Sequence, residues 1–223
     1  MHDSDEISEN ITSAGNIRRR IYNEICDDDF INNIFSIKDF LPENVFSMYL
    51  EAFSAGIFPS SIEKFDTACY SRLISASRDD FTKINNVIGG LENRISEAIA
   101  RNSTIEEVCD NVKTKAFTHS RIRQILLSAS LGVTKEDINS DISYIRVLGF
   151  NETGRNLLNK MRKTSLCPVI TNLSQANSIG DTAKRDISND YTAGKLFNLC
   201  LPCPLKGNPE FDIPPVYIKT EDC

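Results

Sequence analysis

Hydrophobic residues recur every three or four positions through much of residues 17–131, which is the spacing of one face of an α-helix. Pro42 stands just before one such stretch, and the first turn of a helix tolerates proline well. Ser103 and Glu106 have the spacing of a capping box, and Asp79 or Asp80 can open a further short helix. The pattern therefore predicts a run of helices, over residues 17–25, 45–53, 62–73, 91–99 and 118–131 and after residues 79 and 103.

The pattern changes after Lys135. Residues 144–148 and 168–171 are short and rich in β-branched side chains, which predicts two strands, and Asn151 can cap a helix over 152–163 between them. A strand, a helix and a second strand at this spacing predict a small parallel βαβ unit. A last helix is expected over 181–197, followed by an irregular, proline-rich tail. The fold class is therefore mainly α, α+β overall: a helical domain followed by a small α/β unit.

Composition excludes some classes of protein, and charge is unevenly distributed. Of the 223 residues, 40% are hydrophobic and 25% charged, which argues against a disordered chain. The sequence contains no run of about 18 apolar residues and therefore predicts no membrane span. The net charge is −6, but residues 1–112 carry −10 and residues 113–163 carry +6. A basic stretch in an acidic chain is a candidate anion-binding surface; the alternative is a solvated basic face without a partner.

The basic stretch includes the start of a predicted helix. Thr118 is the expected N-cap, and Phe117 with Ile122 has the spacing of a hydrophobic staple. Lys113 and Lys115, with His119 and Arg121, crowd this N-terminus, where the helix dipole is already positive. Because free backbone N–H groups and cations together favour an anion, we expect a phosphate to bind here. The alternative is that the long side chains simply extend into water.

The chain shows no strong self-contained catalytic or metal-binding motif, so we predict no catalytic residue and no metal ligand. The histidines are His2 and His119, and the seven cysteines are odd in number and irregularly spaced, which is typical of reduced cytosolic thiols. Cys200 and Cys203 form a CxxC without a second pair. A site that also used Cys167 and Cys223 is the weaker alternative to ordinary buried or tail thiols.

Four collinear stretches identify a family resemblance: Gly90-Leu-Glu-Asn-Arg94, the segment Val112–Arg121, the segment Tyr144–Arg155 with its Tyr-Ile-Arg-Val-Leu-Gly-Phe core, and Cys167-Pro-Val-Ile-Thr-Asn172. Together they resemble the C-terminal half of the bacterial tRNA(Met) cytidine acetate ligase family, whose members are nucleotidyltransferase-like. The segment Ile11–Arg18 is similar to the motif that closes the nucleotidyltransferase domain of the family.

The resemblance implies a two-step reaction in the cytoplasm. ATP, the cosubstrate, activates acetate as acetyl-adenylate, and the acetyl group then passes to N4 of the wobble cytidine of elongator tRNA(Met). Catalysis would consist mostly of positioning and charge stabilisation. Ser13, Asn16 and Arg18 would make weak contacts to ATP. The residues expected to contact tRNA are Lys113, Lys115, Thr118, His119, Arg121, Arg123, Arg146 and Arg155.

The resemblance also predicts which part of the family's enzyme this chain is. The ATP site of the family lies mainly in an upstream α/β domain with an H-x-G-H-like motif, which this sequence does not contain. Residues 1–40 would be the end of that domain and a connecting helix, 41–140 a helical domain, and 141–223 the small α/β unit with its helix and tail. We therefore expect a C-terminal fragment, lacking the N-terminal nucleotidyltransferase domain and inactive alone.

Three departures from the family pattern weaken parts of this interpretation. Gly15 replaces a threonine that could contact phosphate, Ala116 stands where the family commonly has arginine, and Phe117 where it has tyrosine. Two other hypotheses stay open. The chain could be a stand-alone interaction module whose basic stretch packs against an acidic partner, including its own acidic half, or a complete enzyme with unrecognised chemistry.

Overall fold

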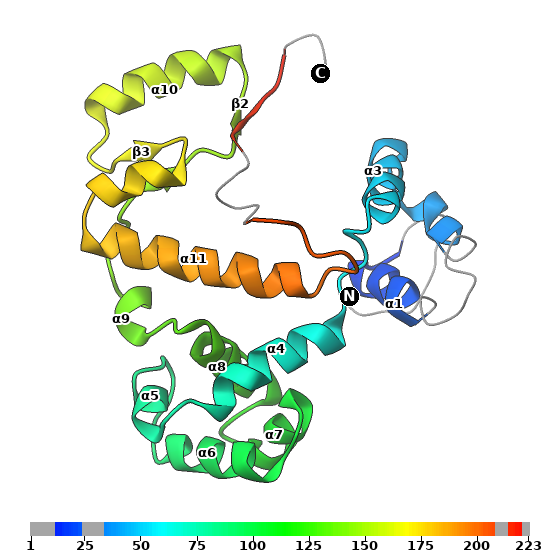
Figure 1. Cartoon of the computed structure of the whole chain (residues 1–223), viewed down its shortest axis with the longest axis vertical. Coiled ribbons are helices and arrows are strands. Elements are labelled where there is room, and N and C mark those ends of the chain that lie inside the picture. The colour runs from blue at the N-terminus through cyan, green and yellow to red at the C-terminus, as the bar shows by residue number, and fades with distance from the viewer. Residues whose placement is uncertain (1–11, 24–33, 208–213, 220–223) are drawn as a thin grey trace. The chain divides into compact units, whose positions relative to one another are not determined.

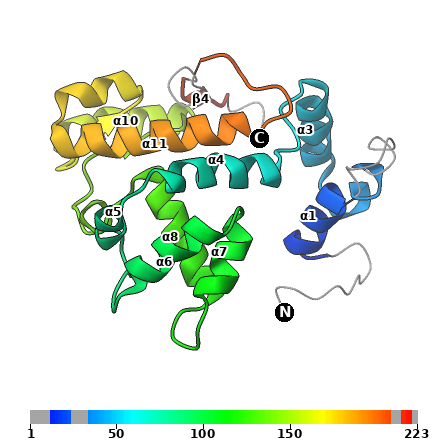
Figure 2. The ribbon, with the colours of Figure 1, turned by 60° about the horizontal axis from the view of Figure 1, so that its bottom comes forward.

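A computed structural model describes residues 12–23, 34–207 and 214–219, and these fall into two units that are described separately (Figures 1 and 2). The first unit contains residues 1–61 and 201–204, and the second contains residues 62–200 and 205–223. This boundary differs from the boundaries predicted after residues 40 and 140. The three-part division of the sequence stays a prediction about domains.

The first unit is a small helical assembly. It contains α1 (Ala14–Asn23), the 3-10 helix η1 (Lys38–Phe40) and α3 (Glu43–Ser54). Its buried core is Ile21, Ile34, Ile37 and Phe46. The predicted helix from Ile17 is present as α1, and Pro42 directly precedes α3, as its position in the sequence indicated. Ile25, the last residue of the predicted apolar repeat, lies outside the described residues.

The second unit begins with a block of helices around the largest core. Its helices are α4 (Ile62–Ile74), α5 (Arg78–Thr82), α6 (Leu91–Arg101), α7 (Ile105–Val112), α8 (His119–Leu131) and the short α9 (Lys135–Ile138). The predicted apolar stripe of α6 is confirmed, because Leu91, Ile95, Ala98 and Ile99 are all buried in this core. Ile122, Ile125 and Leu126 of α8 join them. On the opposite face of α8, the Leu127 side chain is 37% exposed, so that face is not fully covered.

Two helix starts differ from the prediction by one to three residues. The capping box of α7 is formed by Thr104 and Glu107 rather than by Ser103 and Glu106. The cap of α5 is Ser77, whose hydroxyl accepts a hydrogen bond from the Asp80 backbone N–H. In both places more than one residue that can cap a helix lies within a few positions of the helix start. Thr118 of α8 and Asn151 of α10 (Glu152–Thr164) are the predicted N-caps and are confirmed.

The rest of the second unit combines two helices with two very small parallel sheets. β1 (Ile145–Arg146) pairs in parallel with β3 (Val169–Ile170), and β2 (Gly149–Phe150) pairs in parallel with β4 (Val216–Tyr217). The tail was expected to be irregular, so the β2–β4 pair corrects that prediction for Val216 and Tyr217. The pair forms because the Leu148 and Phe150 carbonyls accept hydrogen bonds from the Val216 and Ile218 N–H groups.

Helix α10 (Glu152–Thr164) lies between β2 and β3 in the sequence, and the 3-10 helix η2 (Leu173–Ser178) and α11 (Asp181–Leu199) follow. α11 runs beside α4, as both views show (Figure 2). Ile170 of β3, Leu173 of η2 and Ile187 of α11 form a small core, whereas α10 has no buried residue. The prediction of a mainly helical fold with a small parallel sheet is confirmed. No helix among the described residues is long and apolar enough to cross a membrane.

Candidate nucleic-acid interface

The first residues of the basic stretch, 113–118, form the turn between α7 and α8. α7 ends at Val112, and the backbone N–H of Thr114 donates to the Phe117 carbonyl at 3.0 Å, which closes the turn. Thr118 then caps α8 by accepting a hydrogen bond from the Arg121 N–H at 3.4 Å. Phe117 packs against the main core next to buried Ile122, as expected for a hydrophobic staple. The turn therefore has a defined conformation.

Two arginines connect the end of α7 and the start of α8 to α6 and to the loop that precedes it. Arg94 donates to the Val112 carbonyl at 2.8 Å, and Arg121 donates to the Asn86 carbonyl at 3.2 Å. The Arg121 guanidinium also lies over the Phe117 ring, 5.2 Å from its centroid. The first two stretches of the family resemblance, which are far apart in the sequence, thus meet at one surface. We call residues 85–90 and 113–121 the α8 corner.

Lys113 and Lys115 are the exposed cations of the α8 corner. Among the residues that the structure describes, neither forms an ion pair. Both residues stand shortly before the N-terminus of a 13-residue helix, where the dipole already carries partial positive charge. A polyanion would relieve this like-charge arrangement, because phosphate oxygens accept hydrogen bonds from lysines and backbone N–H groups.

His119 and Arg123 point instead toward acids of α7. The His119 Nε2 atom lies 3.0 Å from Glu106 Oε1 and 3.8 Å from Asp110 Oδ1, and Arg123 forms an ion pair with Glu106. The sequence segment from Asn111 to Lys135 contains no acid, but helix packing brings two acids to it from the preceding helix. The sequence analysis did not predict that acids of α7 face His119 and Arg123. The available signal was the i, i+4 spacing of Glu106 and Asp110, which places both acids on one face of α7.

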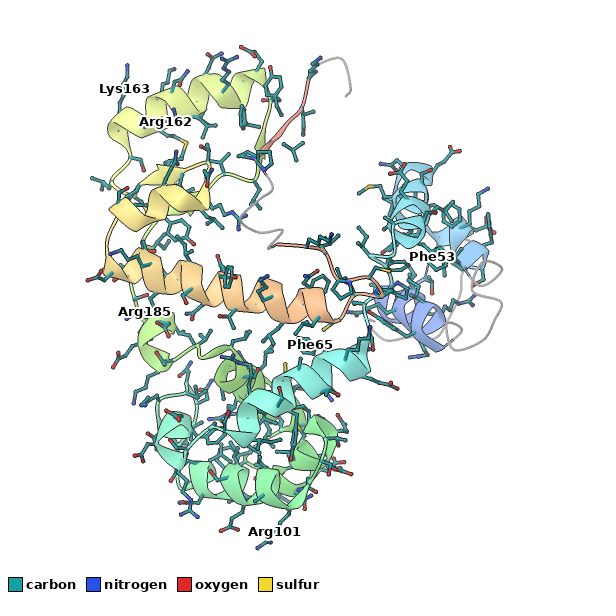
Figure 3. All side chains as sticks on the ribbon, in the orientation of Figure 1. Phe53, Phe65, Arg101, Arg162, Lys163 and Arg185 are labelled. Carbon is teal, nitrogen blue, oxygen red and sulfur yellow. The ribbon has the colours of Figure 1, made fainter. Side chains whose placement is uncertain are left out.

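Arg146 and Arg155 lie elsewhere in the second unit. Arg146 is in β1, and Arg155 is exposed on α10. In Figure 1, α11 separates these elements from the helices of the α8 corner. Figure 3 labels two more basic residues of α10, Arg162 and Lys163, both exposed. Of the predicted tRNA contacts, Arg146 on β1 and Arg155 on α10 therefore lie apart from those in and beside the α8 corner.

The three residues expected to contact ATP lie in the first unit, at the start of α1. The Ser13 hydroxyl accepts a hydrogen bond from the Asn16 N–H at 3.1 Å, and the Asn16 side chain accepts one from Arg20 Nε at 3.3 Å. Asn16 is buried and Arg18 is exposed. Two of these side chains therefore hold the helix start, and Arg18 is the one that is open to solvent.

Three buried cysteines, Cys69, Cys109 and Cys200, show no sign of activation. Burial raises the pKa of Cys109 to about 11 and also raises the pKa of Cys69 and Cys200. Since the thiolate is the nucleophile and the metal ligand, these three thiols are poor candidates for either role at neutral pH. Of the CxxC pair, Cys200 is buried and Cys203 exposed, and Cys223 lies outside the described residues.

Comparison with known proteins places this chain in a family. The sequence model of the HIGH nucleotidyl transferase family matches residues 1–209, and the chain belongs to that family. A tRNA(Met) cytidine acetate ligase of Acetivibrio thermocellus is 28% identical over 209 residues, which cover 91% of this chain and 49% of that protein. One of Thermotoga maritima is 28% identical over 200 residues, covering 83% of this chain and 48% of that protein.

Solved structures agree with the sequence matches. The structure of Thermotoga maritima TmcAL bound with alpha-thio ATP superposes with a TM-score of 0.79 at 27% identity, over 96% of this chain and 53% of that one. The apo structure of the same protein gives a TM-score of 0.81 at 26% identity. The chain thus spans about half the length of the relatives it matches. The comparisons do not bear out the prediction that this half is the C-terminal portion of the family's enzyme.

Proposed function

We propose that this chain is a tRNA-holding portion of a cytoplasmic tRNA(Met) cytidine acetate ligase and that the α8 corner contacts tRNA phosphates. The observation that carries the proposal is the exposure of Lys113 and Lys115 at a capped helix N-terminus that Arg94 and Arg121 hold in place. Such contacts fix the position of an RNA without reading its sequence. Arg146 and Arg155 are second-rank contacts.

The reaction of the intact enzyme needs acetate and ATP as well as tRNA. A carboxylate is a poor acyl donor until one of its oxygens belongs to a good leaving group, which AMP provides in acetyl-adenylate. The exocyclic N4 amine of the wobble cytidine then attacks the activated carbonyl, forming the amide and releasing AMP. Ser13, Asn16 and Arg18 supply weak ATP contacts at most, so this chain alone is expected to be inactive.

Two assays of the purified chain test the proposal. Filter binding of elongator tRNA(Met) over a series of salt concentrations should give an affinity that falls steeply with salt, because each neutralised phosphate releases counterions. Incubation with ATP, radiolabelled acetate and tRNA should give neither acetyl-adenylate nor acetylated tRNA. Absence of tRNA binding at low salt would contradict the tRNA-holding role, and formation of acetyl-adenylate would contradict the expected inactivity.

One observation favours a second candidate, a helical interaction module without catalysis. His119 and Arg123 face Glu106 and Asp110, so part of the basic stretch packs against the acidic half of the same chain. On this hypothesis the basic stretch serves internal packing or binds an acidic protein. If the chain is such a module, it should bind acid-rich control proteins at least as tightly as it binds tRNA. If it is a tRNA-holding portion, it should bind tRNA more tightly than any such control.

A further inference from the structure

Three potential metal ligands from two helices converge at the side of the α8 corner. Glu106 and Asp110 are four residues apart on α7, so both side chains project from the same face of that helix. His119 is the first residue of α8, and the Thr118 cap fixes where it begins. One ligand atom from each of the three side chains lies within 4.8 Å of the other two.

The histidine nitrogen is the least explained atom of this cluster. His119 Nε2 is buried and has no hydrogen-bond partner among the described residues, although Glu106 Oε1 lies only 3.0 Å away. The two atoms are thus close but not aligned for a hydrogen bond. A buried polar atom without a partner is costly, although the His119 side chain as a whole is 26% exposed. A cation between the nitrogen and the carboxylates would satisfy all three groups.

The distances are also those of a metal site. Zinc binds imidazole nitrogen and carboxylate oxygen at about 2.0–2.2 Å, which places neighbouring donor atoms roughly 3–4 Å apart. The separations of 3.0 Å and 3.8 Å from His119 Nε2 lie in that range. We propose that Glu106, Asp110 and His119 form a binding site for a zinc ion, with water in the remaining position.

The donor set decides between candidate ions. Imidazole suits zinc and its neighbours in the first transition row, whereas magnesium and calcium prefer oxygen donors alone. Arg123 forms an ion pair with the second oxygen of Glu106, which orients this carboxylate and leaves Oε1 free for the ion. The ion adds two positive charges beside the α8 corner. The site depends only on residues of this chain, and its existence does not rest on the proposed function.

Zinc titration in competition with a chromophoric chelator tests the site, using the full chain stripped with EDTA and kept reduced with a phosphine. We expect one equivalent to bind, and His119→Ala and Asp110→Asn to weaken binding at least tenfold. His2→Ala removes the other histidine and should bind like the wild type. Circular dichroism should show that all variants keep their helical content, and Asp110 is exposed, so its variant should fold.

Cobalt(II) substitution distinguishes the proposed donors from cysteines. Nitrogen and oxygen ligands give visible d–d bands without the near-ultraviolet charge-transfer band of a thiolate, and this spectrum should disappear in His119→Ala. Three results would overturn the proposal: no saturable zinc binding, binding that His119→Ala leaves unchanged, or binding that Cys203→Ser abolishes. No tRNA is present in these measurements, so their failure is separate from a failure of the tRNA-holding role.

Discussion

The two basic surfaces of the second unit, the α8 corner and α10, have similar charge in the sequence but different surroundings. At the α8 corner, Arg121 is held by a backbone carbonyl and an aromatic ring, and Arg123, just beyond the corner on α8, is held by a carboxylate. On α10, Arg155, Arg162 and Lys163 are exposed. The α8 corner is therefore an ordered surface with two exposed lysines, whereas α10 carries its cations on a helix that has no buried residue.

This difference shows that a count of charges along the sequence does not measure a binding surface. The same guanidinium can neutralise an acid, hold a loop or contact a ligand, and helix packing decides which of these it does. A surface whose backbone is held in one conformation loses less conformational entropy when it binds. We therefore expect the α8 corner to contribute orientation and α10 to contribute mainly non-specific attraction.

The largest expected difference between the two surfaces is in stability. Ile125 of α8 is buried in the main core, whereas the Leu157 side chain of α10 is 56% exposed. Ile125→Ala should lower the free energy of unfolding by about 2–5 kcal/mol, because it leaves a cavity. Leu157→Ala should change it by less than about 0.5 kcal/mol. Urea denaturation of both variants measures the contrast, and equal losses would show that α10 belongs to the core.

A smaller effect is expected from the arginine that holds the end of α7. Arg94→Ala removes the hydrogen bond to the Val112 carbonyl and should cost about 1.5–3 kcal/mol, as expected for a charged donor. Arg101→Ala is the matched control, since that arginine is exposed at the end of α6 (Figure 3). Denaturant melts of the two variants give the comparison. If Arg94→Ala is no more harmful than Arg101→Ala, Arg94 does not hold the α8 corner together.

The two confirmed caps should differ in what they stabilise. Thr118→Ala removes the α8 cap and should lower global stability by about 1 kcal/mol. Asn151→Ala removes the hydrogen bond that the Gly154 N–H donates to the Asn151 side chain at 2.9 Å. Because α10 buries no residue, that loss should appear as faster amide exchange within α10 and leave the global transition almost unchanged. Hydrogen exchange read by NMR checks both expectations.

The smallest expected effect is a pH dependence of the free energy of unfolding, caused by Asp80 of α5, outside both basic surfaces. Hydrogen bonds from Lys83 and Ser77 lower the pKa of Asp80 from 3.8 to about 2 in the folded chain. A lowered folded pKa adds stability that is fully present above pH about 4 and is lost as the pH falls toward 2. The stability difference between wild type and Asp80→Asn should therefore be present at pH 6 and disappear near pH 2. A difference that is constant over this range would contradict the assignment.

Helix periodicity and capping residues predicted much of the fold, since both are local properties. The α6 stripe and the Thr118 and Asn151 caps were predicted correctly, whereas the Ser103 cap was one residue early. The pairing of Gly149–Phe150 with Val216–Tyr217 was not predictable, because it joins segments 67 residues apart whose local sequence favours turns and irregular backbone. Similarly, the acids opposite His119 come from another helix, so their i, i+4 spacing on α7 indicates a shared face but not that His119 lies against it.

The most direct test of the central claim removes only the two exposed lysines of the α8 corner. Lys113 and Lys115 are exposed, so the double alanine variant should keep the stability of the wild type. We predict weaker binding of elongator tRNA(Met) and a log–log salt dependence shallower by about 1.4–1.8, which corresponds to two lost phosphate contacts. Lys206→Ala with Lys219→Ala removes the same charge from the C-terminal segment and should change the slope little. Equal slopes for all three proteins would contradict the claim that the α8 corner holds tRNA.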